Sequence, residues 1–347
     1  MAAKQIYLYK KQIVFSMGAV REYLKLSRSF NAGLTGISPV MGAVSMGEGR
    51  LLPLFLLFLV GFFGHVYGFV VNDIVDLKVD RLSSEISDRP LVSGTISKRN
   101  AWIFAIVSMA LSLSIAAFLS FRYYSFFPAM PLLIASALSI TAYDFISKKY
   151  PAMDVFVGAG IFLLILYGAS SVGKLTELAW IVAVLGTIQV LFMQFIAGGL
   201  KDAENDYRAK ANTLAIKMGV RVENKKMFVP LSFKALAYFL QALDIALIFI
   251  SLIFIFGFEK SIVQIAILVP LSIAMVAISA KLIGMKKFDR NRARKLIGLH
   301  YYTNFSLVPI MLTVINPWLA LLIFVPFGAF VLSNITLHGT LLQPKTM

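Results

Sequence analysis

Residues 51–80 read LLPLFLLFLVGFFGHVYGFVVNDIVDLKVD, and this stretch decides the fold. Its first part, 51–71, contains no Asp, Glu, Lys or Arg, and it supplies the roughly 20 apolar residues that a transmembrane helix needs. The whole chain of 347 residues shares this character, with 59% hydrophobic and only 14% charged residues. Soluble domains carry about 45–50% apolar and about 25% charged residues. The sequence therefore predicts an all-α, polytopic membrane protein.

Apolar runs of similar length recur along the chain, separated by charged connections. The predicted membrane spans are 30–47, 51–71, 101–121, 125–143, 154–172, 178–199, 235–257, 261–283 and 299–315. A tenth candidate, 317–337, follows the turn signal Asn316-Pro317. These runs predict a single integral membrane domain, residues 1–347, built as a bundle of nine transmembrane helices with a tenth candidate at the C-terminus.

The basic residues are distributed unevenly between the two sides of the predicted bundle. Of the 33 Lys and Arg residues, 28 lie in the N-terminal tail or in and beside the connections after the second, fourth, sixth and eighth spans. The opposite connections hold only Arg50, Arg122, Lys174 and Lys260. By the positive-inside rule, we expect the N-terminus and the two long connections, about 72–100 and 200–234, to lie in the cytoplasm. The net charge of +16 thus reflects topology and does not point to nucleic acid.

Two groups of oxygen-bearing side chains follow spans that end on this cytoplasmic side. In the first group, Asn72, Asp76 and Asp80 recur at every fourth position and share one face if the helix continues past the membrane. In the second group, Asp202 and Asp206 have the same spacing. Mg²⁺ prefers a few carboxylates and takes its remaining ligands from water and substrate phosphate. The two groups therefore predict a pair of magnesium sites that hold a diphosphate between them.

Several cations lie near the same predicted site. A diphosphate leaving group gains negative charge as its C–O bond breaks, and nearby cations stabilise that charge. The candidates are Arg28, Arg89, Lys148 and Lys201. Tyr143 ends the fourth span, where an aromatic side chain also serves as an interfacial anchor.

Taken together, these motifs resemble the UbiA-type intramembrane prenyltransferases. The resemblance extends from Arg28-Ser-Phe-Asn31 to about residue 315. It rests on Asn72-Asp73-x-x-Asp76-x-x-x-Asp80, Arg89-Pro90-Leu91-x-x-Gly94-x-Ile96-Ser97, Tyr143 with Lys148, Asp202-x-x-x-Asp206 and Asn212-Thr213-Leu214. It implies a helix bundle around a central cavity, with both aspartate motifs over its cytoplasmic mouth. It also implies a Mg²⁺-diphosphate complex bound by Asn72, Asp76, Asp80, Asp202 and Asp206. Some members of the family have a third acidic residue where this chain has Lys210, so no ligand is assigned there.

The resemblance further implies the transfer of a prenyl group from a polyprenyl diphosphate, such as geranylgeranyl or farnesyl diphosphate, to a small acceptor. The acceptor is an aromatic quinone precursor or a glycerol-phosphate lipid, and diphosphate is released through a carbocation-like step. The predicted catalytic residues are Tyr143, whose ring face stabilises the cation, and Lys148 and Arg89, which hold the diphosphate. The predicted substrate-binding residues are Arg28, Asn31, Asp73 and Lys201, and Asp73 supports the site without binding metal.

A membrane transporter with an acidic ion site on the cytoplasmic side is the alternative reading. Transporters place polar groups near the bilayer midplane, and Asp244 lies deep in the seventh predicted span, although its role is not predicted. A phosphatidyl-type transferase would carry its aspartates in one compact run with interspersed glycines, which this chain lacks. The chain also has no cysteine, which excludes disulfides and thiolate chemistry. Metal-dependent release of diphosphate would distinguish an enzyme from a transporter.

Overall fold

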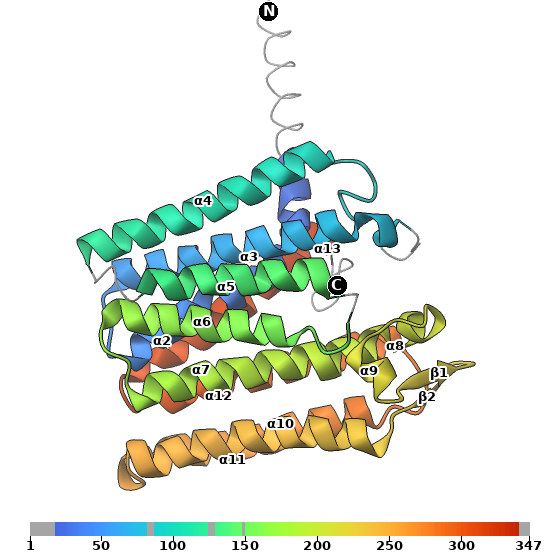
Figure 1. Ribbon diagram of the computed structural model, residues 1–347. Coiled ribbons are helices and arrows are strands. Elements are labelled where there is room, and N and C mark those ends of the chain that lie inside the picture. Colours follow the sequence, from blue (N-terminus) through green and yellow to red (C-terminus); the bar gives the residue numbers. More distant parts are fainter. Residues whose placement is uncertain (1–17, 82–86, 124–128, 148–149, 340–347) are drawn as a thin grey trace, which may run out of the picture.

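The computed structural model describes residues 18–81, 87–123, 129–147 and 150–339. Long helices lie side by side along one common direction, with α4 at one edge of the bundle and α10 and α11 at the opposite edge (Figure 1). The first half of the chain forms helices α2 Ser29–Ser45, α3 Leu51–Asp80, α4 Lys98–Arg122, α5 Ala129–Ile146 and α6 Val155–Val172.

The second half begins with one helical path, in which α7 Glu177–Leu191, the π-helical segment η2 Phe192–Gly198 and α8 Gly199–Arg208 follow one another without a break. It continues with α9 Leu214–Lys217, β1 Arg221–Glu223, β2 Lys226–Phe228, α10 Leu231–Ile250, η3 Ser251–Ile255, η4 Glu259–Ser261, α11 Ile262–Ile283, α12 Arg290–Leu312, η5 Pro317–Ile323 and α13 Phe324–His338. Strands β1 and β2 pair as a short antiparallel hairpin at the same end of the bundle as α8 and α9 (Figure 1).

Within the described ranges, eight helical segments are long and apolar enough to cross a membrane, and one of them is the C-terminal segment Pro317–Leu337. The predicted all-α membrane bundle is therefore confirmed. The count of nine spanning helices remains a prediction, because α2 and α12 lie within the bundle but are not among these eight segments. Helix α2 has 17 residues, and α12 opens with a basic first turn.

Helical structure extends beyond the predicted spans toward the basic side. Helix α3 continues to Asp80, which confirms that the first oxygen-bearing group lies on a helical extension. The region predicted as a long connection, 200–234, instead contains α8, α9 and the hairpin. Helix α12 begins at Arg290, before the predicted boundary at 299, because the Asp289 side chain caps it by accepting a 3.0 Å hydrogen bond from the Arg292 amide.

Helices α2 and α6 approach each other closely at two glycines. A Cβ atom added to Gly168 would lie 1.9 Å from the Pro39 carbonyl oxygen, and one added to Gly42 would lie 2.0 Å from the Ile165 carbonyl oxygen. Small residues permit this kind of backbone contact between helices in lipid. The contact holds α2 deep inside the bundle, so the residues at its N-terminal end lie beside the central cavity.

Candidate active site

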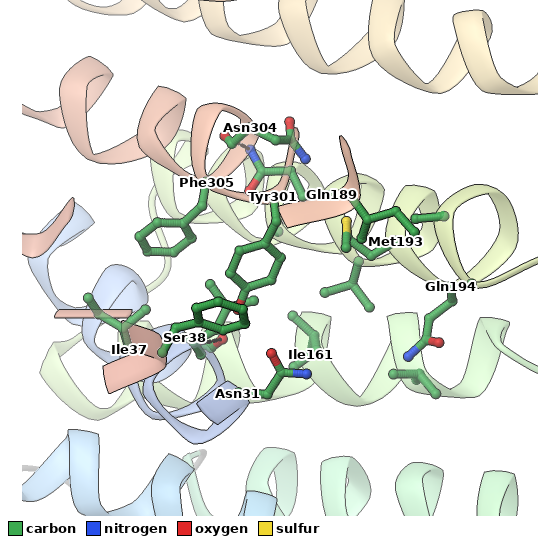
Figure 2. Close-up of a pocket in the computed structure, with 18 of the residues that line it drawn as sticks. Asn31, Ile37, Ser38, Ile161, Gln189, Met193, Gln194, Tyr301, Asn304 and Phe305 are labelled. Carbon is green, nitrogen blue, oxygen red and sulfur yellow. Dashed lines mark hydrogen bonds between the residues drawn. The ribbon is translucent and has the colours of Figure 1, made fainter. Parts of the chain in front are cut away.

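A central cavity of about 270 Å³ lies between α2, α6, α7, η2 and α12. Its polar lining includes Arg28, Asn31, Gln194, Lys201 and Arg294. Figure 2 shows the side chains of Asn31, Gln194 and Tyr301 turned into the same space from three different helices. The remaining lining is mostly apolar and includes Ile37, Met41, Ile165, Val182, Phe305 and Val308. The cavity thus combines a cationic part with an apolar part.

A second cavity of about 190 Å³ lies between α3, α5 and α6. Arg28, Phe69 and Gln194 line both cavities, so the two spaces adjoin at these side chains. The second cavity carries Asn72 and Tyr143 in its lining, which places two predicted site residues beside Arg28.

Arg28 is held at the junction of the two cavities by several contacts. Its Nη2 donates a 2.6 Å hydrogen bond to Asp73 Oδ1, and its guanidinium lies 5.0 Å from the centre of the Phe69 ring. Its backbone has a φ of 46°, a left-handed conformation that is uncommon for a residue other than glycine and that recurs at functional sites. Burial lowers the pKa of Arg28, but Asp73, with smaller contributions from Asp80 and Tyr143, acts in the opposite direction, and the net pKa shift is upward.

Arg89 joins the carboxylates of the first motif. Its Nη1 donates a 2.7 Å hydrogen bond to Asp80 Oδ2 and lies 3.5 Å from Asp73 Oδ1. Burial and the neighbouring Arg28 lower the pKa of Arg89, although Asp73 and Asp80 act in the opposite direction. The buried carboxylate of Asp73 is therefore contacted by two guanidinium groups, those of Arg28 and Arg89. Both groups are charged, because an arginine side chain stays protonated in proteins. This arrangement holds two guanidinium groups, balanced by Asp73 and Asp80, next to the predicted diphosphate site.

The second motif is also paired with cations. Arg290 Nη2 donates a 2.8 Å hydrogen bond to Asp202 Oδ1, and Lys201 Nζ lies 3.4 Å from Asp202 Oδ2. Asp206 is half-buried one turn further along α8. Helix α12 therefore supplies a partner for the second motif, as the segment before α2 does for the first.

The cations that contact the two motifs, Arg89, Lys201 and Arg290, line a common basic basin of about 850 Å³. The turn after α3 contributes Asp88 and Arg89 to its lining, and α8 contributes Lys201, Glu204 and Asn205. The rest of the lining consists of Lys225, the segment before α12 and the first turns of α12, namely Lys287, Phe288, Asp289, Arg290, Asn291, Arg292 and Arg294. Lys201 and Arg294 line both the basin and the central cavity, so the two spaces adjoin at these side chains.

The oxygen donors around Asn72 fit a hard divalent cation. No three acidic or histidine side chains gather as a ready-made metal site within the parts of the chain that the structure describes. Asp144, however, is 3% exposed and is hydrogen-bonded through its side chain to Asn72. Its Oδ2 is buried and has no hydrogen-bond partner among the described residues. The Asp144 carboxylate and the side-chain amide oxygen of Asn72 are the kinds of oxygen ligand that Mg²⁺ prefers. A buried polar atom without a hydrogen-bond partner also calls for a ligand or ion.

Of the two remaining predicted catalytic residues, the structure describes Tyr143 but not Lys148. Tyr143 lines the second cavity, and its hydroxyl donates a 3.3 Å hydrogen bond to Asp154 Oδ1 at the start of α6. This bond restrains the ring next to Asn72 and Asp144. Lys148 lies outside the described residues, so its predicted contact with diphosphate remains a prediction.

Sequence reasoning missed Asp144, Arg290 and Arg294. Asp144 had a usable signal, because a carboxylate in the last turn of a spanning helix is itself a functional candidate. The two arginines resembled ordinary topology-setting charges, and nothing local links them to Asp202, which lies 88 positions from Arg290.

Asp244, whose role was not predicted, lies within the bundle and is 2% exposed. Gln189 Nε2 donates to Asp244 Oδ1 over 3.4 Å and to the Asn304 carbonyl oxygen over 3.2 Å. Gln189 and Asn304 both line the central cavity (Figure 2). Asp244 does not line it and contacts the cavity wall through Gln189.

Comparison with known proteins identifies the family of this architecture. The model of the UbiA prenyltransferase family matches residues 34–295. The digeranylgeranylglyceryl phosphate synthase of Thermococcus gammatolerans is 29% identical over 207 residues, which cover 58% of this chain and 71% of that protein. The enzyme of the same name from Sulfolobus acidocaldarius is 30% identical over 203 residues, which cover 58% of this chain and 70% of that protein.

Solved structures share the fold. A structure of digeranylgeranylglyceryl phosphate synthase superposes with a TM-score of 0.60 at 23% identity, covering 87% of this chain and 98% of that one. A UbiA homologue from Archaeoglobus fulgidus bound to GPP and Mg²⁺ superposes with a TM-score of 0.56 at 24% identity, covering 89% of this chain and 99% of that one. Because the family model matches most of the chain and the bundle is the same, this protein belongs to the UbiA prenyltransferase family and is a multi-pass membrane prenyltransferase.

Proposed function

We propose that this prenyltransferase transfers a polyprenyl chain from its diphosphate to a hydroxyl group of a glycerol-phosphate lipid, with Mg²⁺ as cofactor. The observation that carries the proposal is the central cavity, which joins a cationic part at Arg28, Lys201 and Arg294 to an apolar part. These two parts match the two halves of a prenyl diphosphate. The names of the relatives, digeranylgeranylglyceryl phosphate synthase, support the proposed acceptor. The Archaeoglobus structure that holds GPP and Mg²⁺ supports the proposed donor and cofactor.

The chemistry is proposed to begin with departure of the diphosphate. The bond between C1 of the prenyl chain and the diphosphate oxygen breaks, and the diphosphate keeps the electron pair. The acceptor oxygen then forms a bond to C1 and loses its proton to diphosphate or solvent. Arg28, Arg89 and Lys201 are proposed to bind the diphosphate oxygens and so stabilise the charge that develops on them. Asn31 lines the same cavity and is proposed to orient the donor.

We propose that the two oxygen-bearing groups bind Mg²⁺ together with Asp144, the carboxylate that is hydrogen-bonded to Asn72. When bound, Mg²⁺ neutralises charge on the diphosphate and makes it a better leaving group. Asp73 is proposed to hold Arg28 and Arg89 in place for the same anion. The proposed ligands are Asn72, Asp76 and Asp80 on α3, Asp202 and Asp206 on α8, and Asp144 on α5.

The basic basin favours an acceptor that carries a phosphate group over an uncharged one. It adjoins the central cavity at Lys201 and Arg294, and its cations outnumber its carboxylates. Such a concave basic surface attracts an anionic group and raises its local concentration. A glycerol-phosphate lipid bound with its phosphate in the basin would keep its apolar chain in the membrane.

A product screen by mass spectrometry tests the proposed function. The purified protein is incubated with labelled geranylgeranyl diphosphate, Mg²⁺ and a panel of acceptors that includes a geranylgeranylglyceryl phosphate and aromatic quinone precursors. We expect a prenylated glycerol-phosphate lipid and one equivalent of diphosphate, both abolished by EDTA. Products from the quinone precursors alone would contradict the proposed acceptor. An absence of metal-dependent diphosphate release with every acceptor would favour the transporter alternative.

The proposed orientation places the N-terminus and both aspartate motifs in the cytoplasm. Because the chain has no cysteine, a single introduced thiol reports on one position. Asn224→Cys in the hairpin is expected to react with an impermeant maleimide only after the membrane is opened. Lys174→Cys, in the exposed connection between α6 and α7, is the matched control and should react in intact cells. The reverse labelling pattern would overturn the orientation.

The ring of Tyr143 is proposed to stabilise the allylic cation through its face. A desolvated cation–π contact contributes about 2 kcal/mol, which corresponds to about 30-fold in rate. Tyr143→Phe keeps the ring and loses only the hydrogen bond to Asp154, so we expect most of the activity to remain. Tyr143→Leu should lose about 30-fold in kcat with little change in donor KM. Equal losses in the two variants would assign the role to the hydroxyl instead.

A further inference from the structure

We propose that the C-terminal helix α13 forms part of the prenyl-chain site, and that Phe330 contacts the chain and closes the cavity toward the surrounding lipid. Helix α13 lies wholly outside residues 34–295, the part of the chain that the family model matches. Phe330 is nevertheless one of the residues that line the central cavity, together with Asn31 and Leu34 of α2 and Tyr301 and Phe305 of α12. The inference rests on the proposed prenyl donor occupying this cavity.

The position of α13 follows from a gap in the packing of the bundle. Helices α2 and α12 both line the cavity, but they are not a closely packed pair within the part of the chain that the structure describes. Helix α13 instead packs along α2 and also reaches α12. Helix α13 thus covers the space between α2 and α12 by packing its backbone along α2 and reaching α12 through aromatic side chains. Its outer surface is largely exposed and suits contact with lipid.

The contact between α13 and α2 is close and specific. A Cβ atom added to Gly33 would lie 2.7 Å from the Ala329 Cβ and 3.2 Å from the Pro326 Cα, so only glycine permits this approach. The Ser29 and Ser333 hydroxyls lie 2.8 Å apart, and Arg21 Nη2 donates a 3.0 Å hydrogen bond to the Leu337 carbonyl oxygen. These contacts fix the helix along the length of the gap.

The contact with α12 is aromatic. The Tyr302 ring lies 5.5 Å from Phe330 and 5.1 Å from Phe327, in both cases with edge-to-face geometry. Phe330 is 4% exposed, whereas Phe327 is 44% exposed, so the two rings differ in how far they are withdrawn from the surface. Only Phe330 of these two lines the cavity. Its ring is thus held by α12 while it faces the space proposed for the chain.

The experiment compares the binding of a chain-bearing ligand with the binding of the diphosphate head alone. Geranylgeranyl S-thiolodiphosphate, an unreactive donor analogue, and inorganic diphosphate are each titrated with Mg²⁺ into wild type, Phe330→Ala and Phe324→Ala. Phe324 lies on the same helix and is 64% exposed, so it controls for the loss of a phenylalanine from α13. Truncation of an apolar contact typically weakens binding by about tenfold or more. We expect this loss for the analogue in Phe330→Ala, with unchanged affinity for diphosphate and no effect in Phe324→Ala.

Three outcomes of the titrations would overturn the inference. If Phe330→Ala weakens the binding of the analogue and of diphosphate equally, Phe330 has a general structural role. If the affinity for the analogue is unchanged, Phe330 does not contact the prenyl chain. A wild-type protein that binds diphosphate but not the analogue would overturn the proposed donor, and this inference with it. A photoreactive diazirine placed in the prenyl chain gives an independent measurement that does not depend on folding of a variant. We expect it to label α13 in the wild type, and labelling confined to the other helices would contradict the proposal.

Discussion

Asp76→Asn and Asp202→Asn are each expected to lower turnover of the prenyl diphosphate by at least about 100-fold, the scale seen when one preorganised electrostatic contact to a reacting group is removed. Each substitution keeps the shape of the side chain but removes the negative charge that the proposed Mg²⁺ sites require. Because the two residues lie on separate helices, α3 and α8, equal losses would indicate that both motifs serve one substrate.

The measurement is the initial rate of diphosphate release at saturating donor and Mg²⁺. Glu177→Gln provides a matched control, since Glu177 begins the same continuous helical path that ends beyond Asp202 but lies at the opposite end of it. The control should keep wild-type activity and melting temperature. Near-normal turnover in either aspartate variant would exclude that motif from the metal site.

Arg28→Gln is expected to raise the donor KM by at least about 30-fold, because a desolvated contact to a charged group is worth about 2–5 kcal/mol. It should also destabilise the protein, since removing one partner of a buried ion pair costs about 3–5 kcal/mol. The Arg28 and Asp73 side chains are 16% and 5% exposed, which makes their 2.6 Å contact such a pair. The remaining contact of Asp73 with Arg89 at 3.5 Å should offset part of this cost.

Combining Arg28→Gln with Asp73→Asn separates the two roles of Arg28. The second substitution removes the buried charge that would otherwise lack its main partner, so the melting temperature is expected to recover. The donor KM should stay high, because the cation that binds diphosphate is still missing. A double variant that regains wild-type donor KM would show that Arg28 acts only by neutralising Asp73. The donor KM from initial rates and the melting temperature are measured on the same preparations.

Local periodicity was enough to predict much of the scaffold. The uncharged run 51–71 predicted a spanning helix, and the spacing of Asn72, Asp76 and Asp80 predicted a shared face if that helix continued. The structure has one helix, Leu51–Asp80, through both. Helical periodicity depends on neighbours within a few positions, which is why the sequence alone carries it.

The partners of the charged residues could not be predicted in the same way. Arg28 contacts Asp73, Arg290 contacts Asp202, and Asp144 contacts Asn72 across separate helices. Along the sequence, Arg290 resembles any other cytoplasmic charge, and Arg28, although predicted to bind substrate, has no predicted partner. The pairings depend on where the helices cross, and those crossings depend on close contacts such as Gly168 on Pro39.

The sequence by itself determined the membrane class, the approximate spans and the two helix faces that carry the proposed metal ligands, because composition and spacing are local properties. Only the tertiary structure decided that one cavity joins Arg28, Lys201 and Arg294, and that α13 lies against Gly33 to close it. The apolar run 317–337 is compatible with any lipid-facing position around the bundle. Its place is set by the shape of the gap between α2 and α12, which exists only after the helices have packed.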